Sequence, residues 1–299
     1  MLDLGTNTAL CTVFFASDRD PRRLRVAEDL HFVTGLGRAR GADGRLSDDG
    51  MGRALRSLRY ISRRLDELGV PPDAVRGAAT AACREAPNGG AFLRQVADEL
   101  GLTYSIVAGE REATLMADAQ RRAWPDDPEL TVVDVGGGST EVVVLAEDRF
   151  VRSVPMGASK LLDALGPTPT AREVDSAVQA ALEPEELPQA RGRLVGVAGT
   201  VTTAREVLDG ATTWDPVRLE GASITRDELL GLSDRLLAMT PAERRALPGL
   251  HPLRADALGP SCRWLAGILD RLGRDTMSVS DQGVRYGLLY EAWPRAVVR

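Results

Sequence analysis

The stretch LTVVDVGGGSTE, residues 130–141, has the sequence of a β-strand, a glycine turn and the start of a second strand. β-Branched residues before Asp134 favour a strand, and the glycines that follow it allow backbone N–H groups to approach a ligand closely. A shorter version, DLGTN, stands at residues 3–7, just before a β-branched and aromatic stretch. A pattern found in both halves of a chain indicates two copies of one domain.

Strand-like and helix-like patterns alternate along the rest of the chain, which predicts α/β layers in each half. Strands are expected at 9–16, 23–30, 75–80, 104–107, 130–133, 141–146, 150–154, 194–197 and 276–279. Helices are expected at 48–68, 91–100, 110–124, 172–182, 201–208, 226–238 and 253–272.

The segment WPDDP at 124–128 has two prolines, two acids and no apolar periodicity, and is the best candidate for a linker. We therefore expect a first domain at 1–124, with a C-terminal helix at about 284–299 able to pack back on it, and a second at 125–283. A glycine- and arginine-rich loop at 34–45 is expected to be mobile.

Composition excludes several classes of protein. The 299 residues carry 43 acidic and 37 basic side chains, a formal charge of −6, which argues against nucleic acid or a membrane surface as a partner. No apolar run approaches the roughly 20 residues of a membrane span, and no signal-peptide core is present. Three widely spaced cysteines suit a reducing compartment, so a cytoplasmic protein is expected, with a homodimer left open.

Rare residue types exclude further chemistry. Only two histidines are present, which rules out a histidine-rich metal site, and neither is followed by aspartate. Lys160 is the single lysine and is followed by leucine, so a Walker-type phosphate loop is absent.

The two aspartate–glycine turns suit the binding of phosphate and metal. Asp3 and Asp134 stand where a strand meets a turn, and each carboxylate can hold a hydrated Mg²⁺. The glycines let amide groups surround an anion, and the neighbouring Thr6, Asn7 and Ser139 add side-chain donors. Two such turns at matched places predict a cleft with a phosphate loop on each wall.

Other candidates have plain structural alternatives when taken singly. Gly199-Thr200 precedes a helix expected to begin near residue 201 and is either a packing turn or an anion site. Lys160 is either a solvated residue at a helix start or a substrate contact. Glu112 lies in a first helical turn, where an acid favours the dipole, and Arg84 is one of many arginines. Glu141 lies beside the second turn, where a carboxylate repels phosphate unless it binds metal or water.

The order of these motifs resembles a known family. They are DLGTN at 3–7, ATAACR at 79–84, GEREA at 109–113, VDVGGGSTE at 133–141, PMGA at 155–158, VAGTVTT at 197–203, RAD at 254–256 and VSDQGVRYG at 279–287. Together they resemble the exopolyphosphatase / guanosine pentaphosphate phosphohydrolase (Ppx/GppA) family of the acetate kinase–Hsp70–actin superfamily, over essentially the whole chain.

The resemblance implies two ribonuclease-H-like domains with a cleft between them and Mg²⁺-dependent release of the terminal phosphate from linear polyphosphate, guanosine pentaphosphate or both. It implies Glu112 as the catalytic base, and Asp134 and Glu141 as metal and water-orienting acids. Phosphate contacts are expected from Gly5, Thr6, Asn7, Arg84, Gly136, Gly137, Gly138, Ser139, Gly199 and Thr200, with Lys160, Arg254 and the arginines of 38–45 as further candidates.

Three departures from the family pattern stand out. Only two residues precede Asp3, Tyr286 replaces a usual acid, and the helical module with His-Asp chemistry that long members append is missing, which makes this a short form. Two alternative functions stay open: a phosphotransferase of the same superfamily, and an alarmone sensor that binds without turnover.

Overall fold

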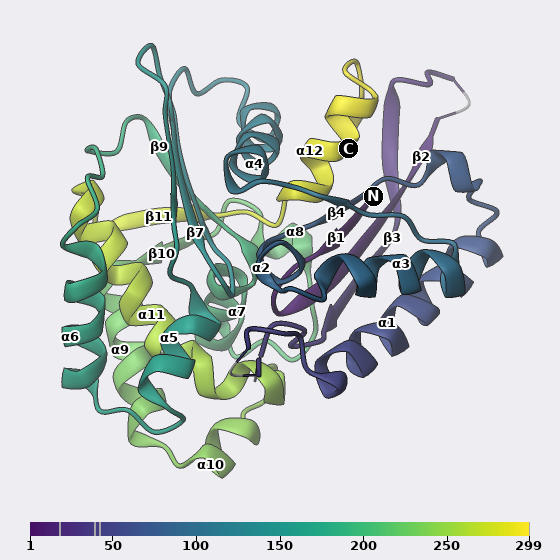
Figure 1. Cartoon of the computed structure of the whole chain (residues 1–299). Helices are drawn as coiled ribbons and strands as arrows, with labels where there is room; N and C mark the ends of the chain where they lie inside the picture. Colours follow the sequence, from purple (N-terminus) through teal and green to yellow (C-terminus); the bar gives the residue numbers. More distant parts are fainter. Residues whose placement is uncertain (18, 39, 42, 299) are drawn as a thin grey trace. The chain divides into compact units, whose positions relative to one another are not determined.

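The computed structural model describes residues 1–17, 19–38, 40–41 and 43–298. The chain forms two compact units: unit 1 is Met1–Ala119 with Val284–Arg299, and unit 2 is Gln120–Gly283. Each unit has its own six-stranded sheet with helices packed on it (Figure 1). The α/β class predicted from the alternating patterns is confirmed.

Unit 1 is built on a mixed sheet with the strand order β12-β3-β2-β1-β4-β5. The strands are β1 (Leu2–Leu4), β2 (Thr8–Ala16), β3 (Arg23–Val33), β4 (Gly77–Ala79), β5 (Ser105–Ile106) and β12 (Val297–Val298). β1 pairs antiparallel with β2 and parallel with β4, so the short first strand is central in its sheet.

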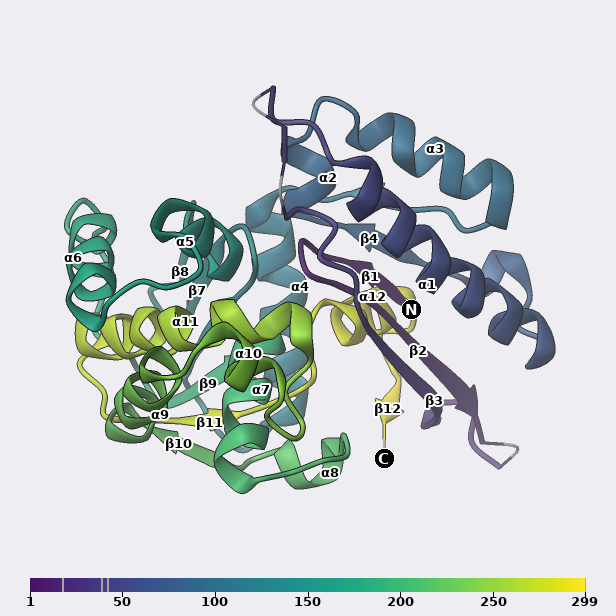
Figure 2. The ribbon, with the colours of Figure 1, turned by 90° about the horizontal axis from the view of Figure 1, so that it is seen from below.

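The helices of unit 1 cover both faces of this sheet. They are α1 (Asp48–Glu67), α2 (Ala81–Glu85), α3 (Gly89–Leu100), most of α4 (Gly109–Ala123) and α12 (Val284–Ala292), with a 3-10 turn at Pro72–Ala74. Leu2 and Leu4 pack in one cluster with apolar residues of α1 and α3, whereas Ala78 packs with residues of α4 and α12 on the opposite face. Figure 2 shows α1 and α3 together along the sheet.

Unit 2 has the strand order β10-β11-β9-β6-β7-β8. The strands are β6 (Leu130–Val135), β7 (Thr140–Leu145), β8 (Phe150–Val154), β9 (Arg193–Val197), β10 (Ser223–Thr225) and β11 (Thr276–Val279). The helices are α5 (Ala158–Leu165), α6 (Ala171–Leu182), α7 (Ala198–Asp209), α8 (Pro216–Leu219), α9 (Arg226–Ala238), α10 (Pro241–Arg245) and α11 (Pro252–Leu272).

The long helix α11 supplies much of the core of unit 2. Its apolar side chains cluster with residues of β6, β9, α6 and α9. Trp264 is fully buried and its indole N–H donates to Thr140 Oγ1 at 2.8 Å. This bond holds the start of β7 against α11, directly beside the glycine turn.

The segment that its prolines suggested as a linker packs within unit 2. The Arg193 guanidinium lies 4.3 Å from the Trp124 ring centroid and pairs with Asp127 at 2.6 Å, and Arg121 donates to the Asp127 carbonyl. Cation–π and ion-pair contacts of this kind cannot be read from local composition, which showed only prolines and acids. Helix α4 runs through the division between the units instead.

The loop at 34–45 is anchored at both ends. Thr34 donates its N–H to the Asn7 carbonyl at 2.8 Å, and Leu46 exchanges two hydrogen bonds with the Asn88 side chain. Arg40 pairs with Glu85 at 3.3 Å. Residues 39 and 42 of this loop lie outside the described residues. No helix of the described chain is long and apolar enough to cross a membrane.

Candidate active site

The two acids of unit 2 face each other across neighbouring strands. Asp134 on β6 is directly opposite Glu141 on β7, and both are buried, at 8% and 1% exposure. The strand expected at 130–133 continues to Val135, which pairs with Thr140, so Asp134 lies within the strand rather than at its junction with the turn. Two carboxylates in one cross-strand pair repel unless a cation or protons lie with them.

The glycine turn 136–139 is fixed by helix α5, which comes two strands later in the chain. Ala158 and Ser159, at the start of α5, donate their N–H groups to the carbonyls of Gly136 and Gly137 at 2.9 and 2.8 Å. Because the C=O and N–H of a trans peptide point in opposite directions, the amides of Gly137 and Gly138 point away from α5. Two adjacent amides aimed to one side form the kind of concavity that binds anions.

This packing also explains a second glycine. A Cβ on Gly157 would lie 2.6 Å from the Gly136 carbonyl oxygen, so only glycine lets α5 come this close to the turn. Lys160 lies in the first turn of α5, where its N–H donates to Gly137 at 3.3 Å and its Nζ reaches Pro155 O at 3.5 Å. The structure thus places the single lysine beside the glycine turn.

The third glycine loop is a helix start. Helix α7 begins at Ala198, so Gly199 and Thr200 belong to its first turn and do not precede it. The expected start near residue 201 is wrong because Ala198 takes φ of +68°, a left-handed conformation that lets the helix follow β9 directly. Thr200 Oγ1 donates to the Val135 carbonyl at 2.9 Å, which ties this turn to the end of β6.

Arg254, in the first turn of α11, is held against the same helix start. Its Nη1 donates to Gly199 O at 2.8 Å and to Thr203 Oγ1. A Cβ on Gly199 would lie 2.5 Å from Arg254 Nη2, so the glycine makes room for the guanidinium. Burial raises the pKa of the nearby Glu206 carboxyl to about 7, against the opposing effect of Arg254. No sequence signal had singled out Glu206, an acid at a mid-helix position.

The first turn of unit 1 is closed in the same way as the glycine turn of unit 2, but the neighbouring segment binds carbonyls one position later. Gly5 N–H donates to Thr8 O at 2.8 Å, which closes the turn. Gly37 donates to the Thr6 carbonyl, and Thr34 and Gly35 donate to the Asn7 carbonyl, at 2.8–3.1 Å. The amides of Asn7 and Thr8 therefore point away from the 34–37 segment, as those of Gly137 and Gly138 point away from α5.

Asp3 lies on the opposite face of β1 from Leu2 and Leu4. It is directly paired with Leu10 and with Ala78, which packs with residues of α4 and α12. Its Oδ1 atom is buried and has no hydrogen-bond partner among the described residues. Burial raises the pKa of Asp3 to about 6, in spite of the lowering effect of Arg285.

Arg84 and Glu112 are brought together in unit 1. Arg84 lies in the last turn of the short helix α2, and its Nη1 donates to Val107 O at 2.8 Å and to Glu112 Oε2 at 3.3 Å. Glu112 lies in the first turn of α4 and is 9% exposed. Because only Nη1 is used in these bonds, the guanidinium can offer further donors to an anion while it orients the carboxylate.

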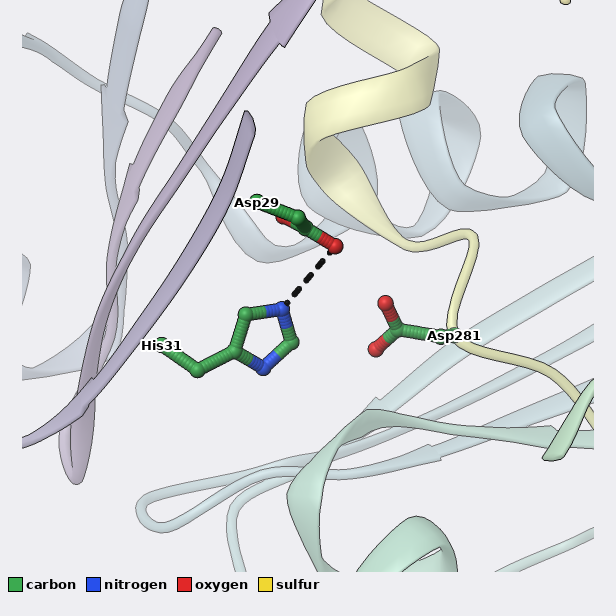
Figure 3. A group of neighbouring side chains, drawn as sticks. All are labelled: Asp29, His31 and Asp281. Carbon is green, nitrogen blue, oxygen red and sulfur yellow. Dashed lines mark ion pairs between the residues drawn. The ribbon is translucent and has the colours of Figure 1, made fainter. Parts of the chain in front are cut away.

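The motif VRYG supplies a structural arginine. Arg285 on α12 is buried and donates to Thr12 Oγ1 at 2.6 Å and to Asp29, and its Nη1 lies 3.1 Å from His31 Nε2. Figure 3 shows the Asp29–His31 ion pair on β3, at 3.3 Å. Burial alone raises the pKa of Asp29, but Arg285, His31 and Thr12 together lower it to about 2. Sequence reasoning missed this cluster, since its members lie far apart along the chain.

The acids present fit a hard divalent cation. Asp134 and Glu141 of unit 2 are buried carboxylates in one cross-strand pair. Carboxylate oxygen is the ligand that Mg²⁺ prefers, and a cation relieves both the repulsion and the cost of burial.

These features define a class of protein. Two α/β units, each with an aspartate and an amide turn suited to phosphate, belong to a protein that acts on phosphoryl groups. The chain is similar to the PPX-GPPA enzyme of Aquifex aeolicus, with TM-score 0.77 and 26% identity over 97% of each chain. It shares its fold with an exopolyphosphatase from Cytophaga hutchinsonii, with TM-score 0.82 and 22% identity over 99% and 97% of the two chains.

A curated relative and a family model complete the assignment. Exopolyphosphatase 2 of Mycobacterium tuberculosis is 30% identical over 276 residues, which cover 86% of each chain. The model of the Ppx/GppA phosphatase family matches residues 20–296, and the chain belongs to this family. The predicted family and its fold of two ribonuclease-H-like domains of the actin superfamily are confirmed, and the protein is a phosphohydrolase.

Proposed function

We propose that this chain is a Mg²⁺-dependent phosphoanhydride hydrolase that releases the terminal phosphate from linear polyphosphate, guanosine pentaphosphate or both. The observation that carries the proposal is the buried Asp134–Glu141 pair, on the two strands that the 136–139 turn connects. The amides of Gly137 and Gly138 in this turn face away from α5. The name of the mycobacterial relative, exopolyphosphatase 2, supports the same substrate class.

Glu112 acts as the general base in this proposal. Its carboxylate accepts a proton from the attacking water, while the ion pair with Arg84 at 3.3 Å keeps it in one orientation. The remaining donors of Arg84 stabilise charge on the phosphoryl oxygens, as a guanidinium does in many phosphate sites. Glu110, two residues earlier on the same helix, is exposed and takes no part.

Backbone and side-chain donors bind the phosphate oxygens. Amides of the two turns donate to them without any reorganisation, because hydrogen bonds from neighbouring segments already fix the turns. The residues proposed for this role are Thr6, Asn7, Gly137, Gly138, Ser139, Gly199 and Thr200, with Lys160 and Arg254 as further substrate contacts. Gly5 and Gly136, also expected as phosphate contacts, instead close the two turns, because their N–H groups donate to Thr8 O and Ser139 O.

Asp134 and Glu141 would hold Mg²⁺, with Asp3 as a further carboxylate ligand. When bound, the ion neutralises charge on the phosphate and so lowers the barrier to attack by an anionic or polarised nucleophile. Glu141 also orients water through its carboxylate.

Free, buried Cys11, Cys83 and Cys262 fit a reducing compartment, and we infer a cytoplasmic location. A homodimer stays a prediction.

A phosphate-release assay tests the proposal. Purified protein is given long-chain polyphosphate or guanosine pentaphosphate, each with Mg²⁺ and with excess chelator. We expect phosphate from at least one substrate and loss of release in chelator. Release that requires an added acceptor would indicate a phosphotransferase, and binding without release would indicate a sensor; either result contradicts the proposal.

A further inference from the structure

A serine on the edge strand of unit 2 continues the row of acids. Asp134 is opposite Glu141 in the β6–β7 ladder, and Glu141 is opposite Ser153 in the β7–β8 ladder. Directly opposed residues project from the same face of a sheet. The three polar side chains therefore form one line across three adjacent strands.

The serine hydroxyl is committed to the glutamate. Ser153 Oγ donates to Glu141 Oε1 at 2.7 Å, the short distance typical of a hydroxyl that donates to a carboxylate. A serine hydroxyl has one hydrogen to give, so this bond defines its direction. Because Glu141 is 1% exposed, bulk water cannot readily replace that donor.

The strand that carries Ser153 is held by other contacts. The next residue, Val154, is 1% exposed, and the preceding Arg152 pairs with Glu185 at 2.8 Å. The five residues of β8 also pair with β7 throughout. Loss of a single hydroxyl leaves these contacts in place, so its effect should be confined to the Glu141 carboxylate.

We propose that Ser153 is a positioning residue that fixes the orientation in which Glu141 meets the divalent cation or the water. The inference rests on the proposed function for the role of Glu141. A carboxylate on a rotatable side chain pays entropy when it becomes ordered by an ion, and a preformed hydrogen bond removes much of that cost. Hydrogen-bond partners of metal ligands commonly contribute about 10–100-fold in metal affinity.

The test compares two variants of one shape. Ser153→Thr keeps a hydroxyl and Ser153→Val lacks it, and both residues favour a strand. Mn²⁺ serves as the probe, and its binding to the whole protein is measured from the electron paramagnetic resonance signal of the free ion. We expect Ser153→Val to weaken Mn²⁺ binding about 10-fold and Ser153→Thr to retain most of it. Ser278→Val, on β11 of the same sheet, is the matched control and should bind as the wild type does.

Equal Mn²⁺ binding by the Thr and Val variants would overturn the inference, whatever the activity of the enzyme. A wild type that binds Mn²⁺ but releases no phosphate from either substrate would contradict the proposed function alone. A wild type that releases phosphate while Ser153→Val binds Mn²⁺ normally would contradict the role of Ser153 alone. If both proposals hold, kcat should fall in the Val variant and recover in the Thr variant.

Discussion

The two turns that begin each half of the chain share a backbone design but differ in their acids. In both, a neighbouring segment binds two consecutive carbonyls and the amides that follow them point the other way, although the bound carbonyls lie one position later in unit 1 than in unit 2. Asp134 is opposite a second acid, Glu141, whereas Asp3 is opposite Leu10. The comparison teaches that the duplicated feature is the amide turn, while the paired carboxylates belong to unit 2 alone.

The carboxylate that unit 1 adds lies elsewhere. Glu112 comes from a helix rather than from a neighbouring strand, and an arginine fixes it. This arrangement suits a group that must accept a proton, because Arg84 orients the Glu112 carboxylate and the proposal does not use that carboxylate as a metal ligand. The proposed function thus assigns proton transfer to unit 1 and cation binding chiefly to unit 2.

The largest effect is expected from Glu112→Gln. The change keeps the shape of the side chain but removes its basicity, so kcat should fall about 10²–10⁴-fold with little change in melting temperature. Glu110→Gln, on the same first turn, is the matched control and should leave kcat unchanged. A Glu112→Gln enzyme with more than about a third of wild-type kcat would remove this residue from proton transfer.

The second prediction concerns the pH dependence of stability without divalent cations. The pKa of Asp3 is about 6 in the fold and near 3.8 in the unfolded chain, so the folded state favours the protonated acid. Its unfavourable contribution grows as pH rises from about 4 to 6 and is complete above that range. Asp3→Asn should therefore raise the free energy of unfolding at pH 8, by up to about 3 kcal/mol, and by little at pH 4.

Chemical unfolding of Asp3→Asn and of the wild type at the two pH values measures this difference. An equal stability change at pH 4 and pH 8 would show that the ionisation of Asp3 is not linked to folding.

The third prediction separates the two aspartates by their response to Mg²⁺. Asp134→Asn removes a carboxylate from the acid pair and should shift the Mg²⁺ concentration for half-maximal activity at least about 10-fold upward. Asp3→Asn should cause a smaller shift, because no second acid is paired with Asp3. Titration of phosphate release against Mg²⁺ compares them. A larger shift for Asp3→Asn would reverse the assignment of cation binding to unit 2.

The smallest effect concerns backbone strain at the start of α7. Ala198 has a left-handed φ of +68°, which costs an L-residue about 1–2 kcal/mol, and the turn of unit 1 has no such non-glycine residue among those described. Ala198→Gly should stabilise the protein by about 0.5–1 kcal/mol after the entropy of glycine is subtracted. Ala171→Gly, at the ordinary first position of α6, should instead destabilise it. Urea unfolding measures both, and two destabilised variants would refute the argument.

Much of the fold could be predicted because it depends on local patterns. The heptad-like apolar spacing of α1, the capping residue Ser47 and the β-branched run of β6 each act over a few residues. The expected bounds of β8, β11 and α9 match those observed. Short elements such as α2 and β10 were not expected, since their ends are set by packing rather than by sequence periodicity.

The site was predictable only in part, for the same physical reason. Glycine turns and their aspartates can be recognised from adjacent residues. Other contacts join separate parts of the chain. They are the Arg84–Glu112 pair, the hydrogen bond from Ser153 to Glu141, and the pairing of Arg285 with Asp29. A serine in a β-branched strand looks like any half-exposed position, so nothing in its neighbourhood pointed to Glu141.

The most direct test of the central claim is the fate of solvent oxygen. Hydrolysis of polyphosphate in water enriched in ¹⁸O, with Mg²⁺ and no added acceptor, should yield inorganic phosphate with one solvent-derived oxygen, and Glu112→Gln should slow its appearance. Mass spectrometry of the released phosphate reads this out. Phosphate without solvent ¹⁸O, or no release until an acceptor is added, would contradict the assignment of water as the nucleophile and of the chain as a hydrolase.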